Sequence, residues 1–146
     1  MLFRSLSVET VLRLMQGRFP GCPRRGWTFV DVRDVAAAHI AALTTPEAAG
    51  LRFTCTHEFA WMVDLARILA AEFKHQGYKI PTRPLPDFLV RFLAIFNKTA
   101  AMDVPNLGKR IDYSNTQIKR VLGWQPRPLA ESVLDTARTL IAFNLV

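Results

Sequence analysis

Cysteine is scarce in this sequence, and long apolar runs are absent. The 146 residues include two cysteines, Cys22 and Cys55, which stand far apart and in no metal-ligand spacing. Two cysteines cannot build a disulfide framework, so we expect reduced thiols, a cytoplasmic location and no metal site. The apolar run at residues 88–96 is broken by Arg91 and is far shorter than the roughly 20 residues that a membrane span needs. The first residues contain no long apolar core, so we expect no signal peptide, and we expect a soluble protein with no membrane partner.

Long runs of like charge are also absent, although the net charge is +7. The basic residues gather loosely over residues 18–33 and 109–127, without a basic tail. Aromatic residues are not interleaved with them, so we expect a solvated basic surface with some attraction for phosphate and no nucleic-acid partner. Half of the residues are hydrophobic. This excess fits either a well-packed core or an apolar face that meets a partner, and composition leaves both open.

The motifs of the common catalytic and cofactor sites are missing as well. No Gly-x-Gly-x-x-Gly fingerprint, Gly-x-Ser-x-Gly elbow or Tyr-x-x-x-Lys pair occurs. Gly21 and Gly26 have the spacing of a phosphate loop, but Trp27 stands where the phosphate-binding Lys is needed. The His-Glu pair at 57–58 resembles the start of a zinc-protease helix, yet Trp61 stands where the second His is required. We therefore predict no catalytic residue, no cofactor-binding residue and no metal ligand in this chain.

Helices dominate what is present. Apolar residues at helical spacing predict helices over residues 8–16, 59–75, 87–97, 114–122 and 129–143. Ser7 is expected to cap the first helix, and Ser114 opens another as the first residue of a Ser-x-x-Gln capping box. Three helices are expected to end at glycines, at positions 17, 77 and 123.

One strand–helix unit, Trp27–Leu43, says most about the fold. Thr28–Val32 is predicted to form a buried strand, and Asp34 is expected to cap the helix that follows. Residues 51–56 alternate apolar and polar, which predicts a second short strand. A buried parallel strand needs neighbours, because unpaired backbone groups are costly in an interior, and this chain has too few strands to supply them. We therefore expect an α/β chain that is mainly helical and forms part of a larger sheet structure.

This unit and two later motifs resemble one enzyme family. The segment Phe29-Val-Asp-Val-Arg-Asp-Val-Ala-Ala-Ala-His39 is similar to a late strand–helix unit of the extended short-chain dehydrogenase/reductases, the NAD-dependent epimerase/dehydratase family. Lys79-Ile-Pro-Thr-Arg-Pro-Leu-Pro86 resembles the family's substrate-side lobe, and Leu122-Gly-Trp-Gln-Pro-Arg127 resembles its near-terminal signature. The branch most similar is the dihydroflavonol-4-reductase-like one, which includes aldehyde reductases. The resemblance covers the C-terminal part of such an enzyme.

The resemblance implies a partial fold. The whole chain, 1–146, is interpreted as a single partial domain. In it, residues 27–43 form the terminal strand–helix unit of a Rossmann-like cofactor sheet, and residues 1–26 and 51–146 form the substrate-binding lobe. The N-terminal Rossmann core, with its glycine-rich loop, catalytic Ser and Tyr-x-x-x-Lys, is expected to be missing. Truncation, a frameshift or an internal start codon would each produce such a chain.

The resemblance also implies a function. The intact enzyme would reduce a small carbonyl substrate with NADPH or NADH, and this portion would bind no cofactor and be inactive on its own. Trp27 and Phe29 stand where relatives often place substrate-contacting residues, and simple core packing is an equally open interpretation. The alternative function is a non-enzymatic half-protein or relic that docks on a separate cofactor-binding subunit.

Overall fold

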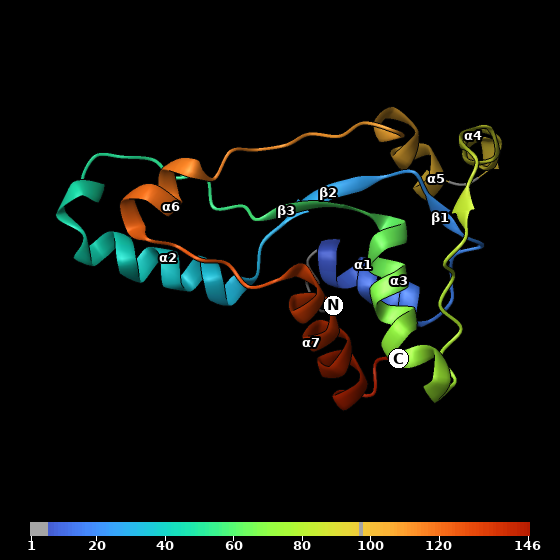
Figure 1. Cartoon of the computed structure of the whole chain (residues 1–146). Helices are drawn as coiled ribbons and strands as arrows, with labels where there is room; N and C mark the ends of the chain where they lie inside the picture. The colour runs from blue at the N-terminus through green and yellow to red at the C-terminus, as the bar shows by residue number, and fades with distance from the viewer. Residues whose placement is uncertain (1–5, 97) are drawn as a thin grey trace. The chain divides into compact units, whose positions relative to one another are not determined.

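The chain folds into two compact units. The computed structural model describes residues 6–96 and 98–146. Unit 1 comprises Met1–Gly26, Trp61–Lys109 and Val133–Val146, and unit 2 comprises Trp27–Ala60 and Arg110–Ser132. Helices make up most of the described structure and the strands are short (Figure 1). This confirms the prediction of a mainly helical α/β chain.

Helices build the core of unit 1. They are α1 (Leu6–Met15), α3 (Met62–Phe73), α4 (Asp87–Phe96), α5 (Lys98–Asp103) and most of α7 (Leu129–Ala142), with short 3₁₀ turns at Lys74–Gln76 and Val104–Asn106. The most deeply buried side chains come from α1 and α3, among them Leu14, Leu65 and Leu69. In α3 the buried positions recur at helical spacing, as predicted, because one stripe of the helix faces the core.

Glycines end three helices where the sequence predicts it. Gly17 follows α1 with φ +63°, and Gly77 follows the turn after α3 with φ +95°. Gly123 follows α6 (Thr116–Leu122) with φ +62°. Positive φ suits glycine because it has no Cβ to clash with the backbone. The predicted helices at 8–16, 87–97 and 129–143 are confirmed to within a few residues, with Asn97 outside the described residues.

Unit 2 has a small core of its own. Its helices are α2 (Val32–Thr44) and α6, which lie side by side, with a 3₁₀ turn at Pro46–Ala48 (Figure 1). Ala38, Ile118 and Trp124 form the buried cluster. Four partly buried hydrophobic residues pack against it: Val30, Phe53, Cys55 and Leu122. The Leu-Gly-Trp motif thus contributes its tryptophan to the packing of α6 against α2.

The predicted strands are the least accurate part of the sequence interpretation. The strand β2 spans Gly26–Phe29 rather than Thr28–Val32, and its residues are half-buried rather than buried. It pairs with β3 (Glu58–Trp61). Backbone bonds join Met62 N to Arg25 O and His57 N to Phe29 O, an order that makes the pair antiparallel. Residues 59–61 therefore belong to a strand and not to the predicted helix at 59–75.

Residues 51–56 form no strand, although a strand was predicted. The alternation that predicted it is present in the side chains, since Phe53 and Cys55 pack inward while Arg52 and Thr54 are exposed. The backbone, however, has no strand partner among residues 6–96 and 98–146. A strand is defined by pairing, so its sequence pattern cannot form one alone.

Three predicted helix caps were wrong. Ser7 is the second residue of α1, which begins at Leu6, so Ser7 lies inside the helix and does not cap it. Asp31 caps α2, because its backbone is extended and its Oδ1 accepts a bond from Arg33 N at 2.8 Å. Asp34 lies one turn further on. In α6 the N-cap is Asn115 without a side-chain cap bond, and Ser114 Oγ accepts from Thr116 N at 3.3 Å instead of closing a capping box.

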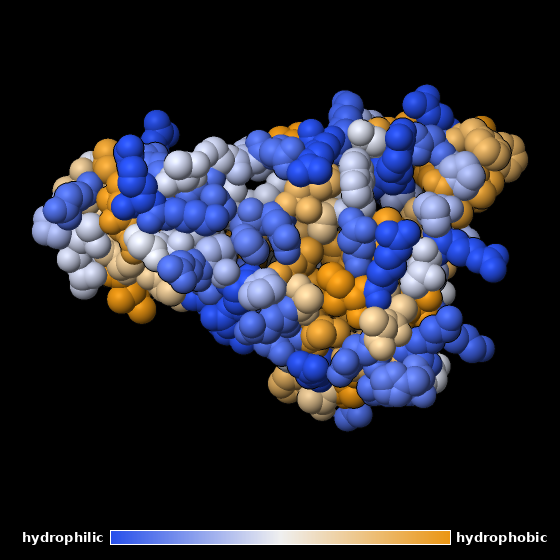
Figure 2. All heavy atoms as spheres, viewed as in Figure 1, coloured by the Kyte–Doolittle hydropathy of each residue, from blue (hydrophilic) through white to orange (hydrophobic). Residues whose placement is uncertain are grey.

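Hydrophobic residues are also found on the surface. Figure 2 shows them gathered over α4, where Phe88, Phe92, Ile95 and Phe96 are exposed on one side of the helix. The rings of Phe92 and Phe96 contact each other edge to face, with centroids 5.7 Å apart. Within the described part of the chain, no helix is long and apolar enough to cross a membrane.

Candidate functional site

A pair of two-residue strands forms one wall of a cavity in unit 1. β1 (Cys22–Pro23) runs parallel to β4 (Pro84–Leu85), and Cys22 N donates to Arg83 O at 2.8 Å. Gly21 makes this approach possible, because a Cβ there would lie 2.8 Å from Leu85 Cγ and 2.9 Å from Arg83 O. The proline-rich segment after Tyr78 thus carries β4, which lies against the loop that follows α1.

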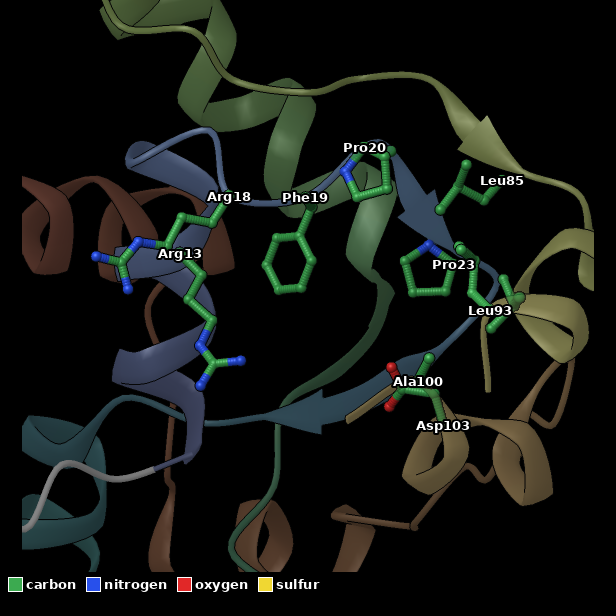
Figure 3. A pocket seen from close by; sticks show the side chains of 11 residues that line it. Arg13, Arg18, Phe19, Pro20, Pro23, Leu85, Leu93, Ala100 and Asp103 are labelled. Carbon is green, nitrogen blue, oxygen red and sulfur yellow. The ribbon is translucent and has the colours of Figure 1, made fainter. Parts of the chain in front are cut away.

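The cavity has a volume of about 430 Å³. This lies within the range of roughly 300–1,000 Å³ for small-molecule sites. Its lining comes from the end of α1 and the loop after it, from β1 and β4, and from α4 and α5: Arg13, Arg18, Phe19, Pro20, Gly21, Pro23, Leu85, Val90, Leu93, Ala100 and Asp103. In Figure 3 the Phe19 ring lies in the middle, with Arg13 and Arg18 on one side and Pro23, Leu85 and Leu93 on the other.

Ion pairs stabilise the loop and the helices at the rim of the cavity. Arg24 binds Asp87, the first residue of α4, at 2.5 Å, and Arg25 binds Asp103 at the end of α5. Gly108 N also donates to Arg24 O at 2.7 Å. These contacts hold the loop at 22–26 to both helices, so two of the basic residues noted in the sequence have a structural role.

Three charged side chains line the cavity, and two of them are already paired. Arg13 Nε lies 2.7 Å from Glu9 Oε1, and Asp103 is bound by Arg25. The side chain of Arg18 is exposed and makes no hydrogen bond or ion pair with any residue in 6–96 or 98–146. The cavity therefore has one cation whose charge the described chain does not neutralise.

Cys22 lies beside this cavity but is not a reactive thiol. Its Sγ lies 3.1 Å from Pro81 O, and burial raises the pKa of the thiol to about 11. A thiol must ionise to act as a nucleophile or as a metal ligand, so Cys22 is inert at neutral pH. Among the described residues, no three His, Cys, Asp or Glu side chains gather closely enough to hold a metal ion.

The joint between β2 and α2 does not suit the phosphates of a nicotinamide cofactor. Asp31 caps α2, and its hydrogen bonds with Arg33 hold the pKa of that carboxyl well below its usual range. Asp34 is buried in the first turn of the same helix. Phosphate binds helix N-termini whose N–H groups are open, whereas this one has an internal carboxylate cap and a second carboxylate behind it. The described residues of this joint therefore do not form a dinucleotide site.

Asp34 instead holds the Trp-Gln-Pro-Arg segment. Arg127 donates to it twice, from its backbone N at 2.9 Å and from Nε at 3.0 Å. Trp124 Nε1 donates to Asp34 O at 2.8 Å. Two motifs that lie about ninety residues apart in the sequence are thus parts of one buried contact.

Trp27 and Phe29, which the sequence suggested as substrate-lining residues, lie in unit 2 on β2. Both are half-buried, and their rings contact each other edge to face with centroids 6.3 Å apart. The cavity described above is lined by residues of unit 1. The role of Trp27 and Phe29 in substrate binding stays a prediction. Sequence reasoning missed the cavity, and its one local signal is the Pro-Gly-Cys-Pro turn at 20–23.

The chain is similar in sequence to known reductases. It is 29% identical over 134 residues to cinnamoyl-CoA reductase 1 of Petunia hybrida, covering 92% of this chain and 34% of that protein. It is 30% identical over 117 residues to the NADPH-dependent methylglyoxal reductase GRE2 of Saccharomyces cerevisiae, covering 80% of this chain and 30% of that protein. The chain is related to the NAD(P)-dependent epimerase/dehydratase-like reductases. No family model matches it.

Solved structures agree with this relationship. The yeast methylglyoxal/isovaleraldehyde reductase Gre2, solved with NADPH, matches 94% of this chain with a TM-score of 0.64 and 28% identity. The crystal structure of gox2253 matches 97% of it with a TM-score of 0.73, and at 20% identity that match shows the fold alone. The chain spans about a third of the length of its curated reductase relatives and 39% and 45% of these two structures. The predicted family is confirmed, while the dihydroflavonol-type branch stays a prediction.

Proposed function

We propose that this chain is the substrate-binding, C-terminal portion of an NADPH-dependent carbonyl reductase and that it has no reductase activity alone. The match to reductases over 92% of the chain is the main support. The cavity of unit 1 is of a size that fits a small carbonyl substrate. The aldehyde and dihydroflavonol-type specificity suggested by the sequence, with Trp27 and Phe29 in the substrate site, belongs to the same proposal.

The proposal assigns no cofactor to this chain alone. NADPH, the cofactor named for the yeast relative, or NADH would supply the hydride in the intact enzyme. The sequence has no glycine-rich phosphate loop and no Tyr-x-x-x-Lys pair, and the joint at Asp31 does not suit phosphate. Residues 27–43 are assigned to the end of the cofactor sheet, and 1–26 and 51–146 to the substrate lobe. We also propose a cytoplasmic location, where the two free cysteines would stay reduced.

Unit 2 has features that suit a further piece of protein beside it. The exposed side of α2 is apolar: Val32 is 77% exposed, Ile40 65% and Leu43 87%. Positions 32, 36, 40 and 43 fall on one helix face. The buried Thr56 hydroxyl has no hydrogen-bond partner in the described chain, although the Thr56 backbone oxygen accepts from Asn115 Nδ2 at 2.8 Å. Thr56 ends the segment 51–56, which pairs with no strand among the described residues. These observations also favour the second candidate, a half-protein that docks on a separately encoded cofactor-binding subunit.

The test compares the chain alone with a chimera. The purified chain is incubated with NADPH and methylglyoxal, and NADPH oxidation is followed by absorbance. We expect no rate above that of buffer. In the chimera this chain replaces the matched region of the yeast methylglyoxal reductase, and we expect NADPH-dependent turnover to return. The yeast protein lacking that region is the matched control.

Two outcomes contradict the proposal. Turnover by the purified chain, once contaminating enzymes are removed, excludes the predicted inactivity. A chimera that is folded by circular dichroism and binds NADPH, yet reduces none of a panel of small aldehydes and ketones, excludes the substrate-binding role. If instead the yeast N-terminal portion, added as a separate polypeptide, restores turnover to the chain, the second candidate is the correct one.

A further inference from the structure

Arg18 gives the cavity of unit 1 a preference for negative charge. Its side chain has no partner in the described chain, while Glu9 pairs with Arg13 and Arg25 pairs with Asp103. A carboxylate placed at Arg18 would gain a charge-assisted hydrogen bond without breaking an existing ion pair. Arginine suits this role because its planar guanidinium presents two parallel donors to a carboxylate.

The remainder of the lining is mainly apolar and well fixed. Phe19, Pro20, Pro23, Leu85, Val90 and Leu93 supply it. Val90 is only 3% exposed, and Pro23 is buried in the β1–β4 pair. A ring or short alkyl chain that enters here leaves water for a preformed apolar surface. The cavity can therefore hold an apolar body as well as an anionic group.

The cationic and the apolar parts of the cavity lining lie on different sides of the cavity. Arg13 and Arg18 lie on one side of the Phe19 ring, and Pro23, Leu85 and Leu93 lie on the other (Figure 3). Asp103 stands on the lining away from the two arginines and already accepts from Arg25. The far side of the lining therefore offers no unpaired cation of the described chain to a second negative charge on the ligand, so the lining suits a single anionic end.

From this we infer that the cavity binds small amphipathic monoanions, each an apolar body with one carboxylate, and that Arg18 binds the carboxylate. The inference deepens the proposed function because it names the substrate class, a carbonyl compound that bears a carboxylate. Only one part of the inference rests on the proposed function, namely that the bound compound also carries a carbonyl group. Binding of the apolar acid itself needs neither cofactor nor turnover.

The test measures binding to the whole chain by isothermal titration calorimetry with two matched probes, 4-phenylbutyrate and its neutral amide. We expect the acid to bind about three- to fivefold more tightly than the amide at low salt, since solvent screens an ion pair at an exposed arginine. Added salt should reduce the difference. Inorganic phosphate, which has the charge without the apolar body, should not compete with the acid.

Three variants locate the site. Arg18→Gln should weaken binding of the acid about three- to fivefold and leave binding of the amide unchanged. Arg91→Gln is the matched control, since Arg91 is exposed on α4 and does not line the cavity. It should leave the affinity for both probes unchanged. Leu93→Phe should weaken binding of both probes, because the larger side chain fills the apolar side of the cavity. Circular dichroism melts confirm that each variant is folded.

Equal affinity for acid and amide overturns the inference, as does an equal effect of Arg18→Gln and Arg91→Gln. Failure of both probes to bind the folded chain at millimolar concentration overturns it too. None of these results depends on NADPH. A chimera that turns over simple aldehydes while the chain ignores 4-phenylbutyrate would keep the proposed function and remove only the substrate class.

Discussion

Asp31 and Asp34 lie three residues apart at the start of α2 and bind different partners. Asp31 caps the helix and pairs with Arg33, whereas Asp34 is buried and accepts from the backbone and side chain of Arg127. The residue type alone does not separate these roles, because either carboxylate can cap a helix or accept an arginine. Their burial and their contacts in unit 2 separate them.

The Asp34–Arg127 pair should be strongly coupled. The Asp34 side chain is 6% exposed and that of Arg127 27%, so solvent screens their attraction only in part. In a cycle of Asp34→Ala, Arg127→Met and the double variant, we expect a coupling free energy of about 1–2 kcal/mol from urea unfolding. The exposed pair Asp135–Arg138 is the control and should give less than about 0.5 kcal/mol. If the coupling free energy of Asp34 and Arg127 were no larger than that of the control pair, the prediction of a strong buried ion pair would be wrong.

Asp31 should make stability depend on pH on the acid side. Its folded pKa lies below the unfolded value of roughly 3.9, mainly through the hydrogen bonds from Arg33. The carboxylate therefore stabilises the fold above about pH 4, and this stabilisation is lost as pH falls through the folded pKa. Asp31→Asn keeps the cap and removes the charge, and should cost about 1 kcal/mol at pH 6 but progressively less below pH 4.

Urea unfolding of both proteins at pH 6 and pH 3 measures this dependence. Asp112→Asn is the control, since Asp112 pairs with Arg110 on the surface of the same unit. An Asp31→Asn deficit that is the same at both pH values would show that the charge of Asp31 contributes nothing to the acid dependence.

At the scale of the elements, the ends of helices can be tested through their glycines. Gly17 and Gly77 both have positive φ, but a Cβ at Gly17 would lie 2.7 Å from Lys79 O, while Gly77 faces open space. Gly77→Ala should cost about 1 kcal/mol, which is the strain of a positive φ. Gly17→Ala should cost at least about 1 kcal/mol more, because backbone on both sides must move. Thermal melts compare the two, and equal losses would exclude the close approach.

The helices could be predicted from the sequence, and the strands and the cavity could not. Gly17, Gly77 and Gly123 mark helix ends that depend only on local backbone conformation. The strand predicted at 51–56 needs a partner that the described chain does not provide. The cavity joins residues 13–23 to residues 85–103, and no periodicity or spacing connects segments so far apart. The local Pro-Gly turn at 20–23 indicates a bend but not what it packs against.

At the scale of the whole molecule, apolar residues on the surface should promote self-association. Unit 1 exposes the side of α4 that carries Phe92 and Phe96, and unit 2 exposes the side of α2 that carries Ile40 and Leu43. Such patches are uncommon on monomeric proteins. The pair of changes Ile40→Lys and Leu43→Lys should lower self-association in sedimentation velocity and leave the free energy of unfolding within about 0.5 kcal/mol, because the replaced side chains are exposed.

Arg91→Lys, a change on the exposed part of α4 that keeps its charge, is the control and should alter neither property. A loss of stability above about 1 kcal/mol in the double lysine variant would mean that α2 buries this face within the chain.

The short parallel pair of β1 and β4 bears on the order in which the protein folds. Cys22 and Pro84 are about sixty residues apart, so closing the chain between them costs several kcal/mol of entropy, roughly 1.5RT ln n plus a constant. The helices need only local contacts and can form first. The cavity wall appears only once the distant segments have met. A ligand that fills the cavity is therefore a probe of the last contacts to form, and its bound fraction during refolding would report the completed topology rather than the helix content.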